Sequence, residues 1–219
     1  MSKFEAVIFD LDGVITDTAE YHYLAWKQLG EGLGIPFDRE FNETLKGVSR
    51  MDSLERILEL GNHQNDFTQE EKEALATKKN DHYVTLIKDV SPKDILPGIE
   101  QLLKDLRLAG FKIAMASASK NAFAVTNSLG LNDYFDHIVD AAKVVNSKPD
   151  PEVFLKAAEA IGVSPDNCIG VEDAAAGVTA INDAGMYAIA IGIDEGLNHA
   201  KIVLASTEAL TMDVINSVS

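Results

Sequence analysis

The stretch Asp10-Leu-Asp-Gly13 places two carboxylates two residues apart at the end of a short apolar run. Residues i and i+2 of an extended chain point to the same side, so Asp10 and Asp12 can act on one spot. Such a pair suits a divalent cation, or a division of labour between a nucleophile and a proton-transferring group. Helix capping or turn stabilisation is the simpler alternative. A calcium loop is disfavoured because its remaining ligand spacing is missing.

Three further segments carry residues that suit phosphate or metal chemistry. Ser117-Ala-Ser-Lys-Asn121 follows a second apolar run, where hydroxyls and backbone N–H groups can bind phosphate oxygens. Lys148 precedes an expected helix, and Glu172 and Asp173 follow another apolar run. Each has an ordinary alternative: an N-cap, a solvated surface charge, or helix N-terminal charge. Their order and their placement at strand ends reinforce one another and favour a shared site.

Apolar runs bounded by turn residues predict buried strands, with segments of helical period between them. The expected strands are Ala6–Phe9, Lys112–Ala116, His137–Val139, Cys168–Val171 and Tyr187–Ile191. The expected helices among them are Ile99–Leu108, Ala122–Leu129, Pro151–Ile161 and Gly177–Ala184. This alternation predicts the α/β class, with a parallel sheet covered on both faces. Ligands of such sheets bind beyond the C-terminal strand ends, where the polar residues fall.

One interval, from about Thr16 to Val90, shows helical periods and no convincing strand. Its best helices are Tyr21–Leu33, Ser53–Leu60 and Gln69–Ile87. A helical block of this size after the first strand predicts a second, smaller domain, most simply a cap over the C-terminal edge of the sheet. We therefore expect a catalytic core of residues 1–15 and 94–219, and a helical cap domain of residues 16–93 inserted after the first strand.

The charge and the apolar stretches limit the possible partners. A formal net charge of −16 repels polyanions, so we expect no nucleic-acid partner, and a phosphorylated substrate would need local cations or a metal. No stretch approaches the roughly 20 apolar residues of a membrane helix, so no membrane partner is expected. The single cysteine, Cys168, excludes an intrachain disulfide. We expect a cytoplasmic protein, by default a monomer.

Asp-Leu-Asp-Gly, a hydroxyl at the second strand end, a lysine before a helix and a Glu-Asp pair together resemble the haloacid dehalogenase superfamily. The resemblance implies a doubly wound α/β core with an inserted helical cap. It implies that Asp10 is a nucleophile that forms an aspartyl-phosphate and that Asp12 is the general acid/base. Ser117 and Ala118 would bind the transferring phosphate, and Lys148 would balance its charge. The implied Mg²⁺ ligands are Asp10, Asp12 (through its backbone carbonyl), Glu172 and Asp173.

Longer segments resemble the bacterial β-phosphoglucomutase family within this superfamily, and the resemblance spans nearly the whole chain. They are Asp10 to His22, Leu45-Lys-Gly-Val-Ser-Arg50, Lys79-Asn-Asp81 and Ser117-Ala-Ser-Lys-Asn121. The implied activity is that of an isomerase of carbohydrate metabolism, which interconverts β-D-glucose 1-phosphate and D-glucose 6-phosphate through β-D-glucose 1,6-bisphosphate. The implied substrate-binding residues are Thr18, His22, Lys46, Gly47, Val48, Ser49, Arg50, Lys79, Ser119, Lys120 and Asn121.

The resemblance also implies individual roles in the cap. Arg50, with Lys120 and Asn121, would grip the non-reacting phosphate, for which a guanidinium fork is well suited. His22 and Lys79 would support closure around the general acid/base. Taken without the resemblance, His22 is more often a packed interfacial histidine, and Lys79 a solvated charge.

Two other functions are alternatives. A magnesium-dependent sugar phosphatase would form the same aspartyl-phosphate on Asp10 and pass the phosphoryl group to water. A regulatory module that binds sugar phosphate without catalysis is disfavoured, because the complete set of four acids is present. The full cap and phosphate segments, Leu45–Arg50 and Ser117–Asn121, favour the mutase over the phosphatase.

Overall fold

The computed structural model describes residues 3–218, which form two compact units. One unit is Thr18–Asp89, and the other contains the described residues before and after it. Residues 16–17 and 90–93, which the sequence suggested as part of the insertion, belong to the sheet-containing unit. Thr16 accounts for this difference, because its hydroxyl donates to Asp94 O over 2.8 Å and its backbone bridges to Asp12 and Ile95.

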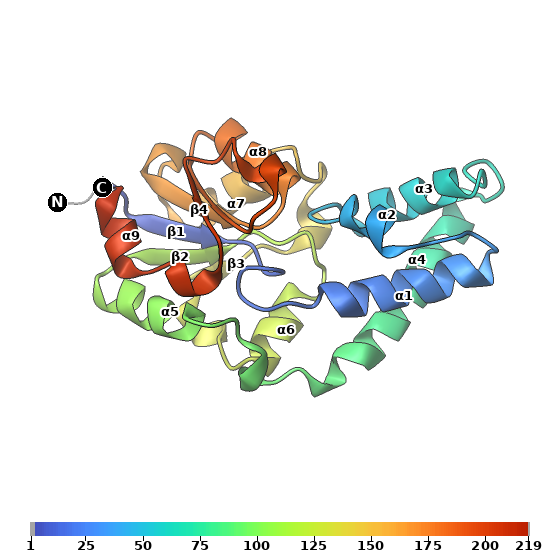
Figure 1. The fold of residues 1–219 in the computed structure, drawn as a ribbon, viewed down its shortest axis with the longest axis horizontal. Helices are drawn as coiled ribbons and strands as arrows, with labels where there is room; N and C mark the ends of the chain where they lie inside the picture. The colour runs from blue at the N-terminus through green and yellow to red at the C-terminus, as the bar shows by residue number, and fades with distance from the viewer. Residues whose placement is uncertain (1–2, 219) are drawn as a thin grey trace. The chain divides into compact units, whose positions relative to one another are not determined.

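The larger unit is built on a six-stranded parallel sheet (Figure 1). Its strands are β1 (Ala6–Phe9), β2 (Lys112–Met115), β3 (His137–Ile138), β4 (Cys168–Glu172), β5 (Tyr187–Ile191) and β6 (Ile202–Leu204). The order β3-β2-β1-β4-β5-β6 puts the first strand inside a doubly wound sheet, which confirms the predicted fold class. The sequence did not predict β6, because this three-residue edge strand gives too short an apolar run.

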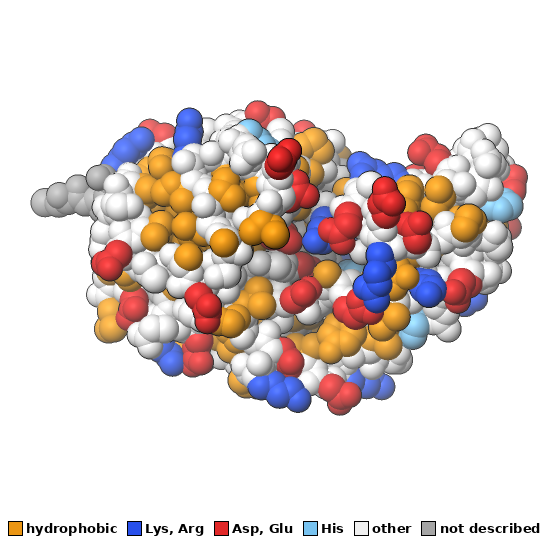
Figure 2. Space-filling view, viewed as in Figure 1, with side chains coloured by type: hydrophobic (Ala, Val, Ile, Leu, Met, Phe, Trp, Pro, Cys, Tyr) orange, Lys and Arg blue, Asp and Glu red, His pale blue; other side chains and the backbone are white. Residues whose placement is uncertain are grey.

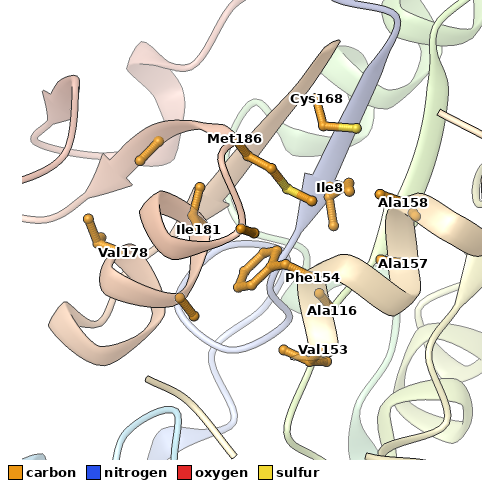
Figure 3. Close-up of a cluster of buried hydrophobic side chains, with 14 of the residues drawn as sticks. Ile8, Ala116, Val153, Phe154, Ala157, Ala158, Cys168, Val178, Ile181 and Met186 are labelled. Atoms are coloured by element: carbon orange, nitrogen blue, oxygen red, sulfur yellow. The ribbon is translucent and has the colours of Figure 1, made fainter. Parts of the chain in front are cut away.

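Helices cover both faces of this sheet. They are α5 (Ile99–Leu108), α6 (Ala122–Ser128), α7 (Glu152–Ile161), α8 (Ala175–Asp183) and α9 (Met212–Ser217). Figure 1 shows α7 and α8 on one face, with α5 and α6 on the other. Between the sheet and the first pair, the side chains of Ile8, Phe154, Cys168 and Ile181 lie together in one buried cluster (Figure 3). Burial on both faces explains why the strands appear in the sequence as continuous apolar runs.

The strand register aligns the C-terminal ends of three neighbouring strands. Phe9 of β1 pairs with Met115 of β2 on one side and with Val171 of β4 on the other. The N–H of Asp10 then donates to Val171 O over 2.9 Å, which continues the pairing by one step. Asp10 and Glu172 therefore lie side by side at the same edge of the sheet.

The smaller unit is a group of helices with its own hydrophobic core. Its helices are α1 (Ala19–Gly32), α2 (Arg39–Glu43), α3 (Arg50–Leu60) and α4 (Gln69–Leu86). Trp26, Leu54 and Ile57 are among the buried residues of that core. The five-residue α2, too short for a helical period to be recognised, begins where the Asp38 carboxylate accepts from Phe41 N over 2.8 Å. This insertion therefore forms a compact unit with a core of its own.

The surface reflects the acidic composition. Asp and Glu number 35 against 19 Lys and Arg, and Figure 2 shows carboxylates spread over the visible face with basic side chains between them. Within residues 3–218, every helix is too short or too polar to span a membrane.

Candidate active site

A buried lysine lies between two carboxylates at the C-terminal edge of the sheet. Lys148 Nζ is 2.8 Å from Asp10 Oδ1 and 2.6 Å from Glu172 Oε1. The side chains of Lys148 and Glu172 are wholly buried, and that of Asp10 nearly so. Isolated charges in such a place would be strongly destabilising, so this arrangement persists because each charge has an opposite partner. The structure thus rules out the alternative of a solvated Lys148.

The second oxygen of Glu172 is held by backbone. Its Oε2 accepts from the N–H groups of Asp173 and Ala174 over 2.8 and 2.9 Å, just before α8 begins. Glu172 therefore also supplies negative charge next to the helix N-terminus, as the simpler alternative proposed. A side chain at Gly177 would overlap the Glu172 carboxylate, and one at Gly13 would overlap Asp173. These two glycines leave the space that the acids occupy.

The mutual influence of the three buried groups appears in their pKa values. Burial raises the pKa of Asp10 from 3.8 to about 7, in spite of Lys148, and the negative charges of Glu172 and Asp12 add to this rise. Burial alone would lower the pKa of Lys148, but attraction to Asp10 and Glu172 outweighs it and raises that pKa. Lys148 therefore remains a cation at neutral pH. With a pKa of about 7, Asp10 is then partly protonated and partly ionised.

Three acids of this edge can share a cation. Asp10, Glu172 and Asp173 each offer a carboxylate oxygen, and these oxygens lie within 4.8 Å of one another. Hard oxygen donors of this kind fit a divalent metal, which would also relieve their mutual repulsion. Asp12 lies outside this carboxylate group, so its expected contribution through the backbone carbonyl stays a prediction.

The segment after β2 forms a series of turns that leads into α6. Ser117 is buried, and its Oγ accepts from Ser119 N over 3.1 Å. The Oγ of Ser119 in turn accepts from Asn121 N over 3.2 Å. A hydroxyl that accepts one bond still has a hydrogen to donate, so both serines could donate to a phosphate oxygen. Ala118 lies between them, and the exposed Lys120 precedes Asn121.

The sequence did not single out Glu152, which holds the loop before Lys148 in place. Its Oε1 accepts from Val145 N over 2.9 Å and its Oε2 from Asn146 N over 2.8 Å. These bonds lower the pKa of Glu152 and fasten the loop that leads to Lys148. A carboxylate four residues after a lysine was the only signal in the sequence, and it does not reveal a contact with loop backbone.

In the inserted unit, the predicted residues His22 and Lys79 meet. Lys79 Nζ lies 2.8 Å from His22 Nδ1 and 4.4 Å from the ring centroid of Trp26. Burial, followed by the charges of Lys79 and Arg50, lowers the pKa of His22 well below 6.5, so its neutral ring accepts from the ammonium. Only 4% of the Lys79 surface is exposed, and the alternative of a solvated lysine is wrong.

Tyr83, which the sequence reasoning missed, connects two predicted residues of the same unit. Its hydroxyl donates to Thr18 Oγ1 over 3.0 Å, and its ring centroid is 4.1 Å from that of His22. Tyr83 is wholly buried, and it lies four positions after Lys79, on the same side of α4. That spacing was the only signal that could have indicated its role.

The loop between α2 and α3 carries the predicted sugar-site residues Lys46, Gly47, Val48 and Ser49. Gly47 has a φ of 72°, which few other residues adopt. Ser49 Oγ accepts from Asp52 N over 3.3 Å and so caps α3. Arg50 follows as the first residue of α3, and its Nη2 donates to Asn80 Oδ1 over 2.8 Å.

With this geometry, the class of protein can be identified. Residues 4–185 match a family model described as haloacid dehalogenase-like hydrolase. The match covers more than half of the chain, and the protein belongs to this family.

More particular relatives are found along nearly the full length. The chain is 47% identical to β-phosphoglucomutase of Bacillus subtilis, over 97% of this chain and 94% of that protein. It is 30% identical to a phosphorylated carbohydrates phosphatase of Thermotoga maritima, over 91% and 90% of the two chains. A crystal structure of β-phosphoglucomutase from Clostridium difficile matches with a TM-score of 0.97 and 52% identity, over 98% of this chain and 96% of that chain.

Proposed function

We propose that this protein is a β-phosphoglucomutase, which interconverts β-D-glucose 1-phosphate and D-glucose 6-phosphate through β-D-glucose 1,6-bisphosphate. The observation that carries the proposal is the near full-length similarity to two proteins of that name, at 47% and 52% identity. The phosphatase relative is more distant, at 30% identity. The mutase is therefore favoured over a phosphatase of the same family.

The chemistry of the larger unit supports transfer through Asp10. Phosphorylated Asp10 gives its phosphoryl group to the 6-hydroxyl of β-glucose 1-phosphate, as the O6–P bond forms and the Asp10–P bond breaks. Asp12 takes the hydroxyl proton. After the bisphosphate exchanges its ends, Asp10 attacks the phosphorus at C1, and Asp12 returns the proton to the departing O1. Glucose 6-phosphate is released and the aspartyl-phosphate is restored.

The neighbouring groups support this transfer electrostatically. Lys148, at 2.8 Å from Asp10, favours the ionised nucleophile and balances the charge of the phosphoryl group. Ser117 and Ala118 bind its oxygens through hydroxyl and N–H groups. We assign Mg²⁺ to Asp10, Glu172, Asp173 and the backbone carbonyl of Asp12, because hard oxygen ligands suit it. Bound Mg²⁺ would neutralise charge on the transferring phosphate.

The remaining predicted residues bind the rest of the sugar phosphate. Arg50, with Lys120 and Asn121, holds the non-reacting phosphate, and Ser119 assists in the same loop. The sugar ring is contacted by the loop residues Lys46, Gly47, Val48 and Ser49. Thr18, His22 and Lys79 form the hydrogen-bonded support of this binding surface with Tyr83. Arg50, Lys46, Lys79 and Lys120 supply the local positive charge that an acidic protein needs for an anionic substrate.

The test is an assay with Mg²⁺, β-glucose 1-phosphate and a trace of β-glucose 1,6-bisphosphate. Glucose 6-phosphate and free phosphate are measured side by side, with α-glucose 1-phosphate as the control substrate. Rapid glucose 6-phosphate formation from the β anomer alone, with little free phosphate, is the expected result. Release of mainly free phosphate would make the protein a phosphatase. An Asp10→Asn variant should form no acid-stable phosphoprotein or product.

A further inference from the structure

The uncharged side-chain oxygen of Asn80 accepts a hydrogen bond from the guanidinium of Arg50. Arg50 opens α3 and Asn80 lies in α4, which packs against α3, and the bond from Nη2 to Oδ1 is 2.8 Å long and partly buried. An amide oxygen accepts a hydrogen bond but carries no net charge. The contact therefore orients the guanidinium fork without neutralising it.

The charge of Arg50 is otherwise uncompensated at close range. Within residues 3–218, no carboxylate forms an ion pair with Arg50. Asp81, the residue after Asn80, is exposed and acts on Arg50 only through longer-range attraction. A guanidinium that is oriented but unpaired is suited to a doubly charged oxyanion, which it can bind with two parallel hydrogen bonds.

We propose that Asn80 is a positioning residue that orients Arg50 toward the non-reacting phosphate of the sugar phosphate. Because the Asn80 side chain is uncharged, the positive charge of Arg50 stays available to that dianion. This inference rests on the role of Arg50 in the proposed function. A carboxylate at position 80 would instead form its own ion pair with the guanidinium and compete with the phosphate. An apolar residue would leave the fork without an orienting acceptor.

The experiment compares Asn80→Ala and Asn80→Asp with the wild type in the mutase assay. Asn80→Ala should raise KM for β-glucose 1-phosphate by about 10-fold or more, the effect of losing one hydrogen bond from a charged donor. Asn80→Asp should raise KM further, because it offers a competing charge. Thr85→Asp is the matched control: it adds the same charge at an exposed position of the same helix that does not share the face of Asn80, and it should leave KM unchanged.

Two readouts separate positioning from a merely structural role. Hydrolysis of acetyl phosphate, a small phosphodonor without a second phosphate, should proceed at the wild-type rate in both Asn80 variants. In an Arg50→Ala background, Asn80→Ala should cause no further rise in KM, because a positioning residue acts only through the group that it orients.

The outcomes decide between the two proposals. Unchanged KM in both Asn80 variants, or an equal rise in KM with and without Arg50, would overturn the role of Asn80. A wild-type protein that consumes acetyl phosphate but forms no glucose 6-phosphate would overturn the proposed function instead. In that case the KM for hydrolysis of the bisphosphate, compared across the same variants, still decides the role of Asn80. Unfolding followed by Trp26 fluorescence verifies that each variant is folded.

Discussion

Lys148 and Glu172 form an ion pair of 2.6 Å in which both side chains are wholly buried. The other carboxylate oxygen of Glu172 accepts hydrogen bonds from two backbone N–H groups, and Lys148 also donates to Asp10. A buried pair of this kind contributes little net stability over an apolar pair, but it becomes strongly destabilising when one partner is removed. The cluster is therefore sensitive to any change that leaves one of its charges alone.

Replacing Lys148 should destabilise the sheet-containing unit. Lys148→Met keeps an unbranched side chain of nearly the same length but leaves Asp10 and Glu172 buried without a counter-charge, which should cost about 3–5 kcal/mol in the free energy of unfolding. Urea denaturation of the metal-free protein measures this loss. Lys143→Met, at a largely exposed lysine five residues earlier, should change stability very little. Equal stability of the two variants would show that Lys148 is not required as the counter-charge.

A methyl group at Gly177 should disturb the acidic cluster. Alanine is favoured over glycine inside a helix by up to about 1 kcal/mol, but a Cβ at position 177 would overlap the Glu172 carboxylate. Gly177→Ala should therefore lower the melting temperature and sharply weaken Mg²⁺-dependent turnover. Gly32→Ala is the control, since nothing lies within 4 Å of its Cβ, and it should leave turnover intact. A fully active Gly177→Ala enzyme would contradict the need for the carboxylate in this place.

Removing Glu152 should loosen the loop that carries Lys148. Glu152→Ala deprives Val145 N and Asn146 N of their acceptors, so both amides should exchange hydrogen faster and turnover should fall severalfold. The pKa of Glu152 is lowered by these same bonds, so their contribution is present above the usual glutamate range and is lost as pH falls through the lowered value. Glu159→Ala, on the same helix, is the control; exchange equally fast in both variants would refute the role of Glu152.

His22 should make the inserted unit less stable in acid. Its pKa is well below 6.5 in the folded protein, because of burial and the charges of Lys79 and Arg50, whereas an unfolded histidine titrates near 6.5. Below about pH 6.5 the unfolded chain therefore binds a proton that the folded chain does not, and stability falls by up to about 1.4 kcal/mol per pH unit. Above that pH the two states bind equally and the effect vanishes.

The measurement uses the only tryptophan of the chain, Trp26, which lies in the core of the inserted unit. Urea unfolding is followed by its fluorescence at pH 7.5 and 5.5. His22→Asn, which retains an acceptor near Nδ1 but does not titrate, should show a smaller loss between the two pH values. His199→Asn, at an exposed histidine, should behave as the wild type. A loss as large in His22→Asn as in the wild type would assign the acid sensitivity to other groups.

Much of the fold followed from local patterns. Buried parallel strands are apolar along their whole length, so β1, β4 and β5 could be recognised from the sequence, and the acids that follow β1 and β4 could be assigned to one edge of the sheet. The helical insertion was recognisable by its period. The three-residue β6 and the five-residue α2 were not, because a period cannot be established over so few residues.

The sequence by itself therefore determined the α/β class, the inserted helical unit and the types of residue available for phosphoryl transfer, because periodicity and residue chemistry are local. Only the tertiary structure decided which of these residues meet. Lys148 reaches Asp10 across 138 positions, Lys79 is buried against His22 across 57, and Asn80 meets Arg50 across 30. Such contacts depend on which faces of distant elements pack together. The same packing decides which charged groups are removed from water and which opposite charge lies beside each of them.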